Sequence, residues 1–262
     1  KNERADRARE PIYLTDPPTT ISLGESGIVG MNDGTVIAWM GGFNSRNEAY
    51  YSISTDDGKS FTPPTLAFPF ADMAPLAGVA FRHDTNVELA VDNSGGMHDG
   101  RLYAAWGGNE AGAVGGSDVY VRYSDDKALT WSEPILVNAN TRDDGQFFPR
   151  ITVDGHGVPH IMYQTRHYDP EHLLIDAEWA HSLDGGINWT TKRLTTTSFD
   201  GDLGIHQDGF PFLGDYNGIA ATHGTVYMAF PSTVTGRAEI AVAVAASDEA
   251  VVHNMSDEHM HS

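Results

Sequence analysis

Ser54-Thr55-Asp56-Asp57-Gly58-Lys59-Ser60-Phe61 is the stretch that decides the fold of this 262-residue chain. Its spacing, Ser-x-Asp-x-Gly-x-Ser/Thr-aromatic, returns from Ser124, where Ala128 replaces the glycine, and from Ser182. In such a turn the Asp and Ser side chains bond to nearby backbone N–H groups, and glycine permits a positive φ. We therefore interpret these residues as structural: Ser54, Asp56, Gly58, Phe61, Ser124, Asp126, Trp131, Ser182, Asp184, Gly186 and Trp189. A decayed fourth copy at Ser247 to Glu249 has no following aromatic residue.

A second marker keeps step with the turns. Apolar runs end in an aromatic residue at Trp39, Trp106, Tyr163 and Phe230. Each aromatic precedes its serine by roughly 15–20 residues, and each unit is roughly 60 residues long, which is a period typical of propellers and repeat arrays. Two markers in one phase over four units indicate a true structural repeat.

Each unit reads as a set of short strands separated by turn residues. In the second unit the expected strands are Asn86–Val91, Arg101–Trp106, Asp118–Tyr123 and Pro134–Asn138. The last unit supplies three strands and stops after Glu239–Ala245. At the other end of the chain, Ile12–Asp16 is similar to the fourth strands Pro134–Asn138 and Lys192–Thr196, and would complete the last unit.

The sequence thus predicts an all-β fold: a β-propeller of about four blades, each a four-stranded antiparallel sheet. An N-terminal strand would close the ring and so remove the exposed sheet edges. The predicted organisation is an N-terminal extension (1–10), the propeller (11–246) and a His/Met-rich tail (247–262).

Composition narrows the classes of function. The chain has 16 Lys and Arg against 36 Asp and Glu, a formal net charge of −20. So acidic a surface repels nucleic acid and anionic lipid. No cysteine is present, which excludes disulfides and thiolate metal sites. No apolar run approaches twenty residues, so no membrane-spanning segment is expected. We expect a secreted, periplasmic or cell-surface protein.

The repeated turns resemble those of the Asp-box, or bacterial neuraminidase repeat, superfamily of β-propellers, and the resemblance covers about Ile12 to Ala246. The segment Phe212–Gly218 also resembles one found in secreted prokaryotic members. The resemblance implies that each box joins the third and fourth strands of a blade. It also implies that the boxes lie away from the usual ligand face, where they serve the fold.

Sialidases of this superfamily use three arginines for the substrate carboxylate, an aspartate acid/base, and a tyrosine nucleophile beside a glutamate. Guanidinium groups suit a carboxylate because they bind it through two parallel hydrogen bonds. The first arginine normally lies in a Phe/Tyr-Arg-Ile-Pro motif. The nearest strings here, Phe81-Arg82-His83-Asp84 and Phe148-Pro149-Arg150-Ile151, both depart from it. No catalytic residue is therefore carried over from the family.

The resemblance places a ligand site on loops at the mouth of the central channel, and three interpretations stay open. A glycan or catalytic pocket would use Arg82, Arg150, Arg166, His167 and Gln207 as ligand-binding residues, with Tyr216, Asp84 and Asp208 as catalytic candidates. A divalent-cation site would draw on His83 and His206, or on the tail residues His259 and His261. In the third interpretation these are solvated loop residues and internal pairs.

The sequence-based hypothesis is an extracytoplasmic propeller that binds a carbohydrate or protein partner through one loop face. One alternative is a sialidase-like glycoside hydrolase. The other is a propeller subunit of a surface or membrane-associated assembly, with a metal as one candidate ligand.

Overall fold

The computed structural model describes residues 11–12, 14, 22–43, 47–81, 83, 87–110, 116–139, 145–207, 210–214, 217–222 and 224–247. Within these residues every regular element except one short 3-10 helix, η1 (Gly201–Leu203), is a β-strand. The chain therefore has the all-β architecture that the repeat predicts.

Consecutive strands pair antiparallel to form sheets that follow one another along the chain. Sheet 1 consists of β1 (Ser22–Gly30), β2 (Val36–Phe43), β3 (Glu48–Ser54) and β4 (Thr65–Pro69). Sheet 2 consists of β5 (Val87–Val91), β6 (Leu102–Gly108), β7 (Asp118–Ser124) and β8 (Ile135–Leu136). Sheet 3 consists of β9 (Gln146–Val153), β10 (Pro159–Thr165), β11 (Asp176–His181) and β12 (Thr190–Arg193).

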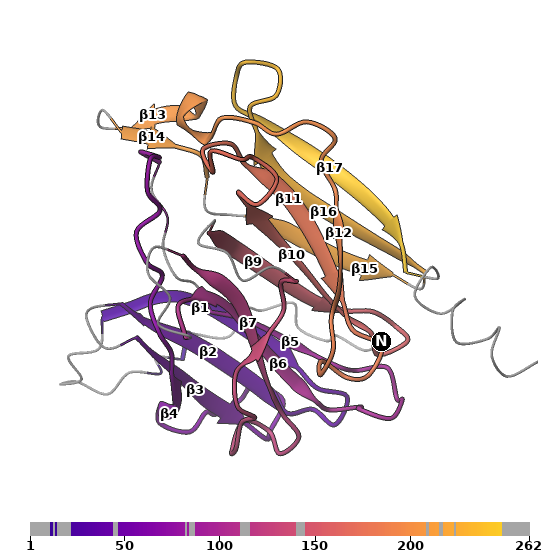
Figure 1. Ribbon diagram of the computed structural model, residues 1–262. Coiled ribbons are helices and arrows are strands. Elements are labelled where there is room, and N and C mark those ends of the chain that lie inside the picture. The colour runs from indigo at the N-terminus through magenta and orange to yellow at the C-terminus, as the bar shows by residue number, and fades with distance from the viewer. Residues whose placement is uncertain are drawn as a thin grey trace, which may run out of the picture.

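Sheet 4 consists of β15 (Gly218–Thr222), β16 (Thr225–Ser232) and β17 (Glu239–Ala246), and a small hairpin, β13 (Ile205–Gln207) with β14 (Phe210–Phe212), precedes it. Figure 1 shows the sheets stacked in chain order, from β1–β4 at the bottom to β15–β17 at the top. The predicted four-stranded antiparallel sheet is confirmed for sheets 1 to 3, and in the second unit each strand end lies within about two residues of its prediction.

The closing strand remains a prediction. Of the segment Ile12–Asp16, only Ile12 and Leu14 are described, and neither belongs to a strand. The predicted tail, 247–262, lies outside the described residues after Ser247.

Three apolar clusters hold the stack together, one at each junction between sheets. Trp39, Phe68 and Trp106 belong to the cluster between sheets 1 and 2. Tyr103 and Tyr163 belong to the cluster between sheets 2 and 3. The cluster between sheets 3 and 4 is built around Trp179, Met228 and Phe230. Successive side chains of a strand point to opposite faces of its sheet. Apolar residues therefore lie on both faces of an inner sheet, which packs against its two neighbours.

The three Ser-Asp turns join the third and fourth strands of sheets 1 to 3 with one repeated set of hydrogen bonds. Each serine hydroxyl donates to the carboxylate of the aspartate two residues on, at 2.7, 2.9 and 2.8 Å in chain order. That carboxylate also accepts the backbone N–H six residues beyond the serine, at 2.9, 2.8 and 2.9 Å. The turns therefore fix the hairpins locally, on side-chain oxygens.

The aromatic residue that ends two of these turns packs between sheets. Trp131 lies 5.1 Å from Phe68 and 5.7 Å from Trp39, ring centre to ring centre. Ala128, where the first and third turns have glycine, takes φ 70° and is buried in the same cluster. The small side chain is thus retained in a strained backbone conformation at a packed position.

Of the fourth copy of the turn, only the serine is described. Ser247 follows β17, and its N–H donates to Gly224 O at 3.1 Å, much as Ser182 N donates to Pro159 O in sheet 3. The buried Ser247 hydroxyl has no hydrogen-bond partner. In the sequence, Glu249 stands where the other three copies have aspartate.

We expect Asp184→Asn to destabilise the fold by about 1 kcal/mol, because the charge that strengthens the turn's hydrogen bonds is lost and an amide nitrogen would replace Oδ2, which accepts the Asn188 side-chain N–H. The value stays low because Asp184 is exposed to solvent. Chemical denaturation at pH 7 measures it, with Asp57→Asn as the matched control in the exposed first turn, where no backbone N–H depends on the carboxylate.

This difference should depend on pH. Burial by itself would raise the pKa of the Asp184 carboxyl. Hydrogen bonds from the Asn188 backbone and side chain outweigh burial and lower this pKa below its ordinary value. A depressed folded-state pKa contributes stability that is fully present above about pH 4 and is lost as pH falls further. The gap between wild type and Asp184→Asn should therefore narrow below about pH 4. A gap that stays constant down to pH 2 would contradict this assignment.

Candidate functional site

A long connection after β4 ties the two halves of the stack together at one end. In Figure 1 it climbs from β4 toward β14. Asp202 in η1 accepts the N–H groups of Ala80 and Phe81 at 2.9 and 3.1 Å, and the Arg166 guanidinium donates to Ala77 O at 2.7 Å. The segment 77–81 thus connects to the loops at the end where the predicted ligand face lies.

The two predicted arginines that the structure describes have different surroundings and do not meet. Arg166 is 1% exposed and directly follows β10, where its N–H donates to Gly145 O. Arg150 lies in β9, five residues after Gly145. Its guanidinium pairs with Glu88 and donates through Nε to Asn217 O at 3.0 Å. Both guanidinium groups therefore contribute to the internal structure.

The two predicted histidines whose side chains are described, His83 and His167, also differ in their surroundings. The His83 ring accepts the Leu76 N–H at Nε2, 3.2 Å away, and Nδ1 lies 3.3 Å from Phe81 O, so one neutral tautomer satisfies both contacts. His167 is half-buried and its ring lies at the loop surface, edge-on to Tyr168.

Several predicted residues lie outside the described part of the chain. Arg82, Asp84, Asp208, Tyr216, His259 and His261 are not described, and for His206 and Gln207 only the backbone in β13 is described. Among the described residues, no group of three or more His, Asp or Glu is arranged to hold a metal ion. The described residues also contain no helix long and apolar enough to cross a membrane.

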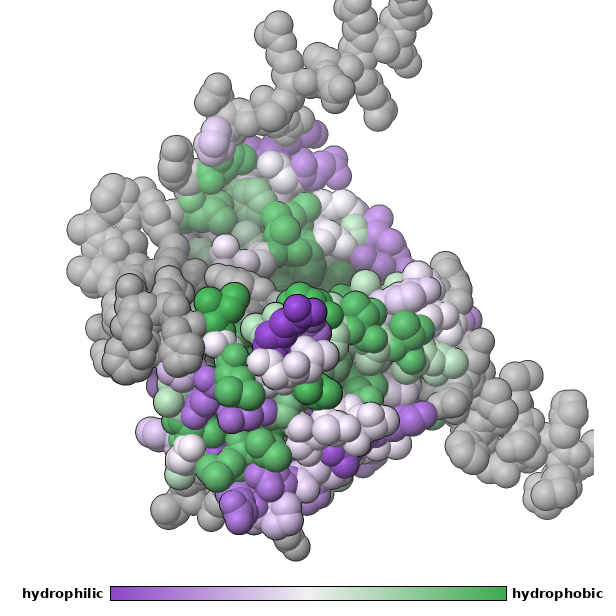
Figure 2. Space-filling view, turned by 90° about the horizontal axis from the view of Figure 1, so that it is seen from above, coloured by the Kyte–Doolittle hydropathy of each residue, from purple (hydrophilic) through white to green (hydrophobic). Residues whose placement is uncertain are grey.

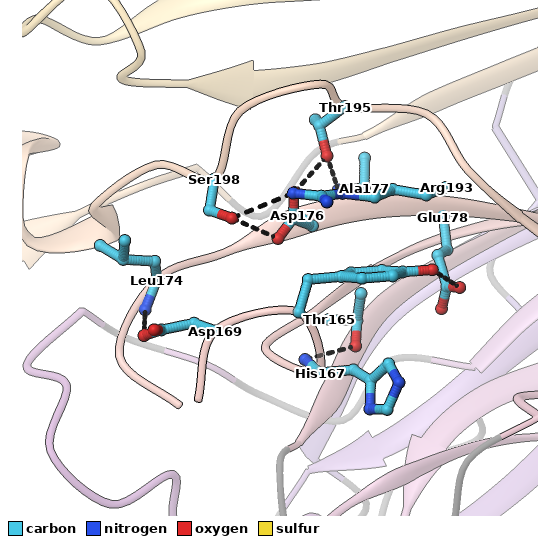
Figure 3. Close-up of polar contacts among 11 residues, drawn as sticks. Thr165, His167, Asp169, Leu174, Asp176, Ala177, Glu178, Arg193, Thr195 and Ser198 are labelled. Carbon is cyan, nitrogen blue, oxygen red and sulfur yellow. Dashed lines mark hydrogen bonds and ion pairs between the residues drawn. The ribbon is translucent and has the colours of Figure 1, made fainter. Parts of the chain in front are cut away.

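The structure brings together a polar group at the loop end of sheet 3 (Figure 3), around the buried carboxylate of Asp176. Arg193 donates to this carboxylate through Nε and Nη2 at 3.0 and 2.7 Å, and the hydroxyls of Thr195 and Ser198 donate at 2.5 and 2.8 Å. Both carboxylate oxygens of Asp176 are thus engaged, and these bonds organise the segment 193–198.

Tyr168 lies beside this centre and contacts three polar side chains. Its hydroxyl donates to Glu178 Oε1 at 2.6 Å, and the Arg193 guanidinium lies 4.3 Å from its ring centre. The His167 ring meets it edge-on at 5.2 Å. An aromatic ring, a guanidinium and a carboxylate are thus held together at the end of the sheet.

Burial and the hydrogen bond to Glu178 raise the pKa of Tyr168, so its hydroxyl stays protonated through the neutral range. Burial and the Glu178 charge likewise raise the pKa of Tyr163, which is directly opposite Glu178 in the sheet.

The loop that presents Tyr168 is held by its own capping residue. Asp169 accepts the N–H groups of Leu173 and Leu174 at 2.8 and 2.9 Å, and these backbone hydrogen bonds lower its pKa. The His172 ring contacts Arg166 O at 3.3 Å. The loop 166–175 is therefore a preorganised platform.

Sequence reasoning missed Tyr168, Glu178, Asp176 and Arg193. One signal was present: Asp176-Ala177-Glu178-Trp179 places two carboxylates inside an otherwise apolar strand, and buried carboxylates need partners. The identity of those partners depends on which strand lies opposite and how the following loop folds.

No known protein-family profile matches the chain, and no curated protein matches it in sequence. Solved structures do match. A Hadza microbial sialidase, Hz136, superposes with a TM-score of 0.55 at 18% identity over 84% of this chain and 43% of that chain. An α-L-arabinofuranosidase from Lactobacillus brevis superposes with a TM-score of 0.51 at 12% identity, over 88% of this chain and 70% of that chain. An ulvan polysaccharide lyase superposes with a TM-score of 0.46 at 11% identity, over 83% of this chain and 51% of that chain.

The fold is therefore of the β-propeller type that the sialidase and the arabinofuranosidase share. At these identities the likeness concerns the fold alone. The chain spans about half the length of the sialidase and of the lyase that it matches.

We expect Asp176→Ala to cost about 3 kcal/mol of folding stability, because it leaves the partly buried Arg193 guanidinium without its carboxylate. Glu171→Ala, an exposed carboxylate on the same loop end, serves as the matched control and should change stability by less than about 0.5 kcal/mol. Denaturant unfolding at pH 7 measures both. Equal stability of the two variants would show that Asp176 does not organise this region.

Proposed function

We propose that this chain is an extracytoplasmic propeller of the Asp-box superfamily that binds a carbohydrate through the loop end of sheet 3. The observation that supports this most directly is the Tyr168 group, in which a rigid, half-buried aromatic ring lies between Arg193, His167 and Glu178. A sugar offers an apolar C–H face and many hydroxyls, which match an aromatic ring flanked by charged donors and acceptors.

The surroundings favour binding by a preformed surface. Asp176 anchors the segment 193–198, and Asp169 holds the loop 166–175, so the platform needs little ordering when a ligand binds. The formal net charge of −20 supports an extracytoplasmic setting, in which strong surface charge maintains solubility. The fold likeness to the sialidase and the arabinofuranosidase is compatible with a glycan ligand.

The binding prediction is tested on a glycan array, followed by titration of the glycans that bind. Tyr168→Ala should weaken binding at least tenfold, because it removes the ring and leaves Glu178 without its donor. Tyr227→Ala, which removes a tyrosine that is 45% exposed on β16, should leave the affinity unchanged. An array without any glycan bound, or equal affinity of the two variants, would refute carbohydrate binding at this face.

A sialidase-like glycoside hydrolase is the second candidate, and one contact favours it. A tyrosine hydroxyl bonded to a buried glutamate is the arrangement that the resemblance implies for a nucleophile and its base, and Tyr168 with Glu178 supplies it at 2.6 Å. Against it, Arg150 and Arg166 are engaged in separate internal contacts, so these two do not form a shared carboxylate grip.

Hydrolysis of a fluorogenic sialoside by the purified chain distinguishes the two candidates. If the chain is a hydrolase, Tyr168→Phe should lower turnover by roughly a hundredfold or more, because the attacking oxygen is gone. Tyr50→Phe is the matched control, since Tyr50 donates to Glu48 at 2.5 Å in sheet 1, away from the proposed site. Lack of turnover by the wild-type chain at high concentration would reject the hydrolase for sialosides.

A further inference from the structure

The outer face of sheet 4 is one exposed apolar area of this molecule. On this face β17 presents Ile240, Val242 and Val244, with 68%, 65% and 61% of their surface exposed. Figure 2 shows a broad apolar area on the side of the molecule on which sheet 4 lies. At the three junctions of the stack, apolar sheet faces of this kind are buried against the next sheet. The area is therefore a packing face of the stack.

A second exposed apolar group lies at the other end of sheet 3 from Tyr168, on the Ser-Asp turns. Four large side chains at the tips of two turns and one loop are 94%, 72%, 46% and 52% exposed there: Met97, Leu129, Leu183 and Ile187. We call these four residues the turn patch. Leu129 and Ile187 hold the same place in the second and third turns, five residues after the serine, where the first turn has Lys59.

The turns themselves do not require an apolar side chain at this place. Ile187 donates its backbone N–H to Asp184 Oδ1 at 3.1 Å, just as Lys59 donates its own to Asp56 Oδ1 at 2.9 Å. Lysine and isoleucine make the same bond because only the main chain takes part. Single exposed apolar residues are common on protein surfaces, whereas a group of them marks a surface that another molecule covers.

Contacts between neighbouring sheets hold the turn patch together. The Arg101 guanidinium donates to both carboxylate oxygens of Asp125, in the second turn, at 2.7 and 2.9 Å. It also donates to Gly185 O, in the third turn, at 2.8 Å. The loop that carries Met97 lies so close to the third turn that a Cβ at Gly185 would be 2.4 Å from His98 Nε2. The two turns and the loop therefore form one connected and preorganised surface.

The rim of the turn patch is acidic. Asp126 and Asp184 in the turns, and Asp99 in the neighbouring loop, accept hydrogen bonds from neutral backbone, hydroxyl and amide groups. Such bonds leave the negative charge of each carboxylate in place. The neighbouring cations Arg101 and Lys127 are each paired with another carboxylate. The surface thus combines an apolar centre with a negative rim.

We propose that the turn patch docks a basic polypeptide segment of a partner protein, in which large apolar residues stand among lysines and arginines. The apolar side chains of the segment pack on the four tips, and its cations face Asp99, Asp126 and Asp184. A second copy of this chain fits less well, because two acidic rims on chains of formal net charge −20 repel each other. The same charge repels an anionic membrane.

The proposal is independent of carbohydrate binding. The loop that carries Tyr168 precedes β11, whereas the third turn follows β11, so the two surfaces lie at opposite ends of sheet 3. A partner on the turn patch therefore leaves the loop end open to a ligand. In this arrangement the Ser-Asp turns serve the fold through their main chain and the partner through their side chains.

A short helical peptide of leucine and lysine, with its leucines along one face, is the probe, and a peptide with glutamate in place of lysine is its control. Fluorescence anisotropy should show binding of the lysine peptide alone. Leu129→Ser with Ile187→Ser should weaken this binding at least tenfold, because two apolar anchors are lost. Leu203→Ser with Ile205→Ser, two residues 51% and 67% exposed at the loop end, should leave the affinity unchanged.

Hydrogen exchange locates the contact, since the bound peptide should slow exchange in residues 125–130 and 183–188 and leave 166–175 unchanged. Failure of the lysine peptide to bind, equal binding of both peptides, or equal affinity of the two double variants would overturn the proposal. A wild-type dimer in sedimentation that the Leu129→Ser, Ile187→Ser variant loses would overturn it as well, because a second copy would then be the occupant. Binding to neutral lipid vesicles that depends on the same two residues would likewise replace the polypeptide with a membrane.

Discussion

Packing of each sheet against the next is the interaction on which the rest of this structure depends. A sheet with two apolar faces is covered on both only when it lies between two other sheets. Stacking the sheets therefore buries both faces of every inner sheet. The tryptophans Trp39, Trp106 and Trp179 lie in these junctions and are almost completely buried. The stack can therefore grow sheet by sheet, and its last face stays exposed in the described residues, where β17 presents Ile240, Val242 and Val244.

The two ends of the stack follow from this packing but differ in their chemistry. At one end, the Ser-Asp turns satisfy their own backbone N–H groups with local side chains, so the hairpins need little from their neighbours. At the other end, contacts join residues far apart in the chain. Asp202 holds Ala80 and Phe81 across more than a hundred residues, and Arg166 reaches Ala77. Function is expected where long-range contacts hold loops on a rigid frame.

Polar groups buried at that second end show which residues remain available to a ligand. Asp176 uses both carboxylate oxygens on Arg193, Thr195 and Ser198, so it serves the structure. Glu178, two positions along the same strand, accepts from the Tyr168 hydroxyl and so connects the protein interior with the loop surface. This difference arises from the loops that cover the strand end, because both carboxylates have the same strand environment and both are buried.

The sequence by itself determined the fold class, the repeat and the strands, because these depend on local patterns: alternation along a strand, turn chemistry and a constant spacing between markers. The tertiary structure alone decided the candidate site. Arg150 and Arg166 look equivalent in sequence, yet one pairs with Glu88 on a neighbouring sheet and the other with a loop 89 residues away. Tyr168 and Glu178 become partners only when the loop after β10 folds back over β11. Such contacts depend on loop paths and sheet packing, and no local pattern in the chain encodes them.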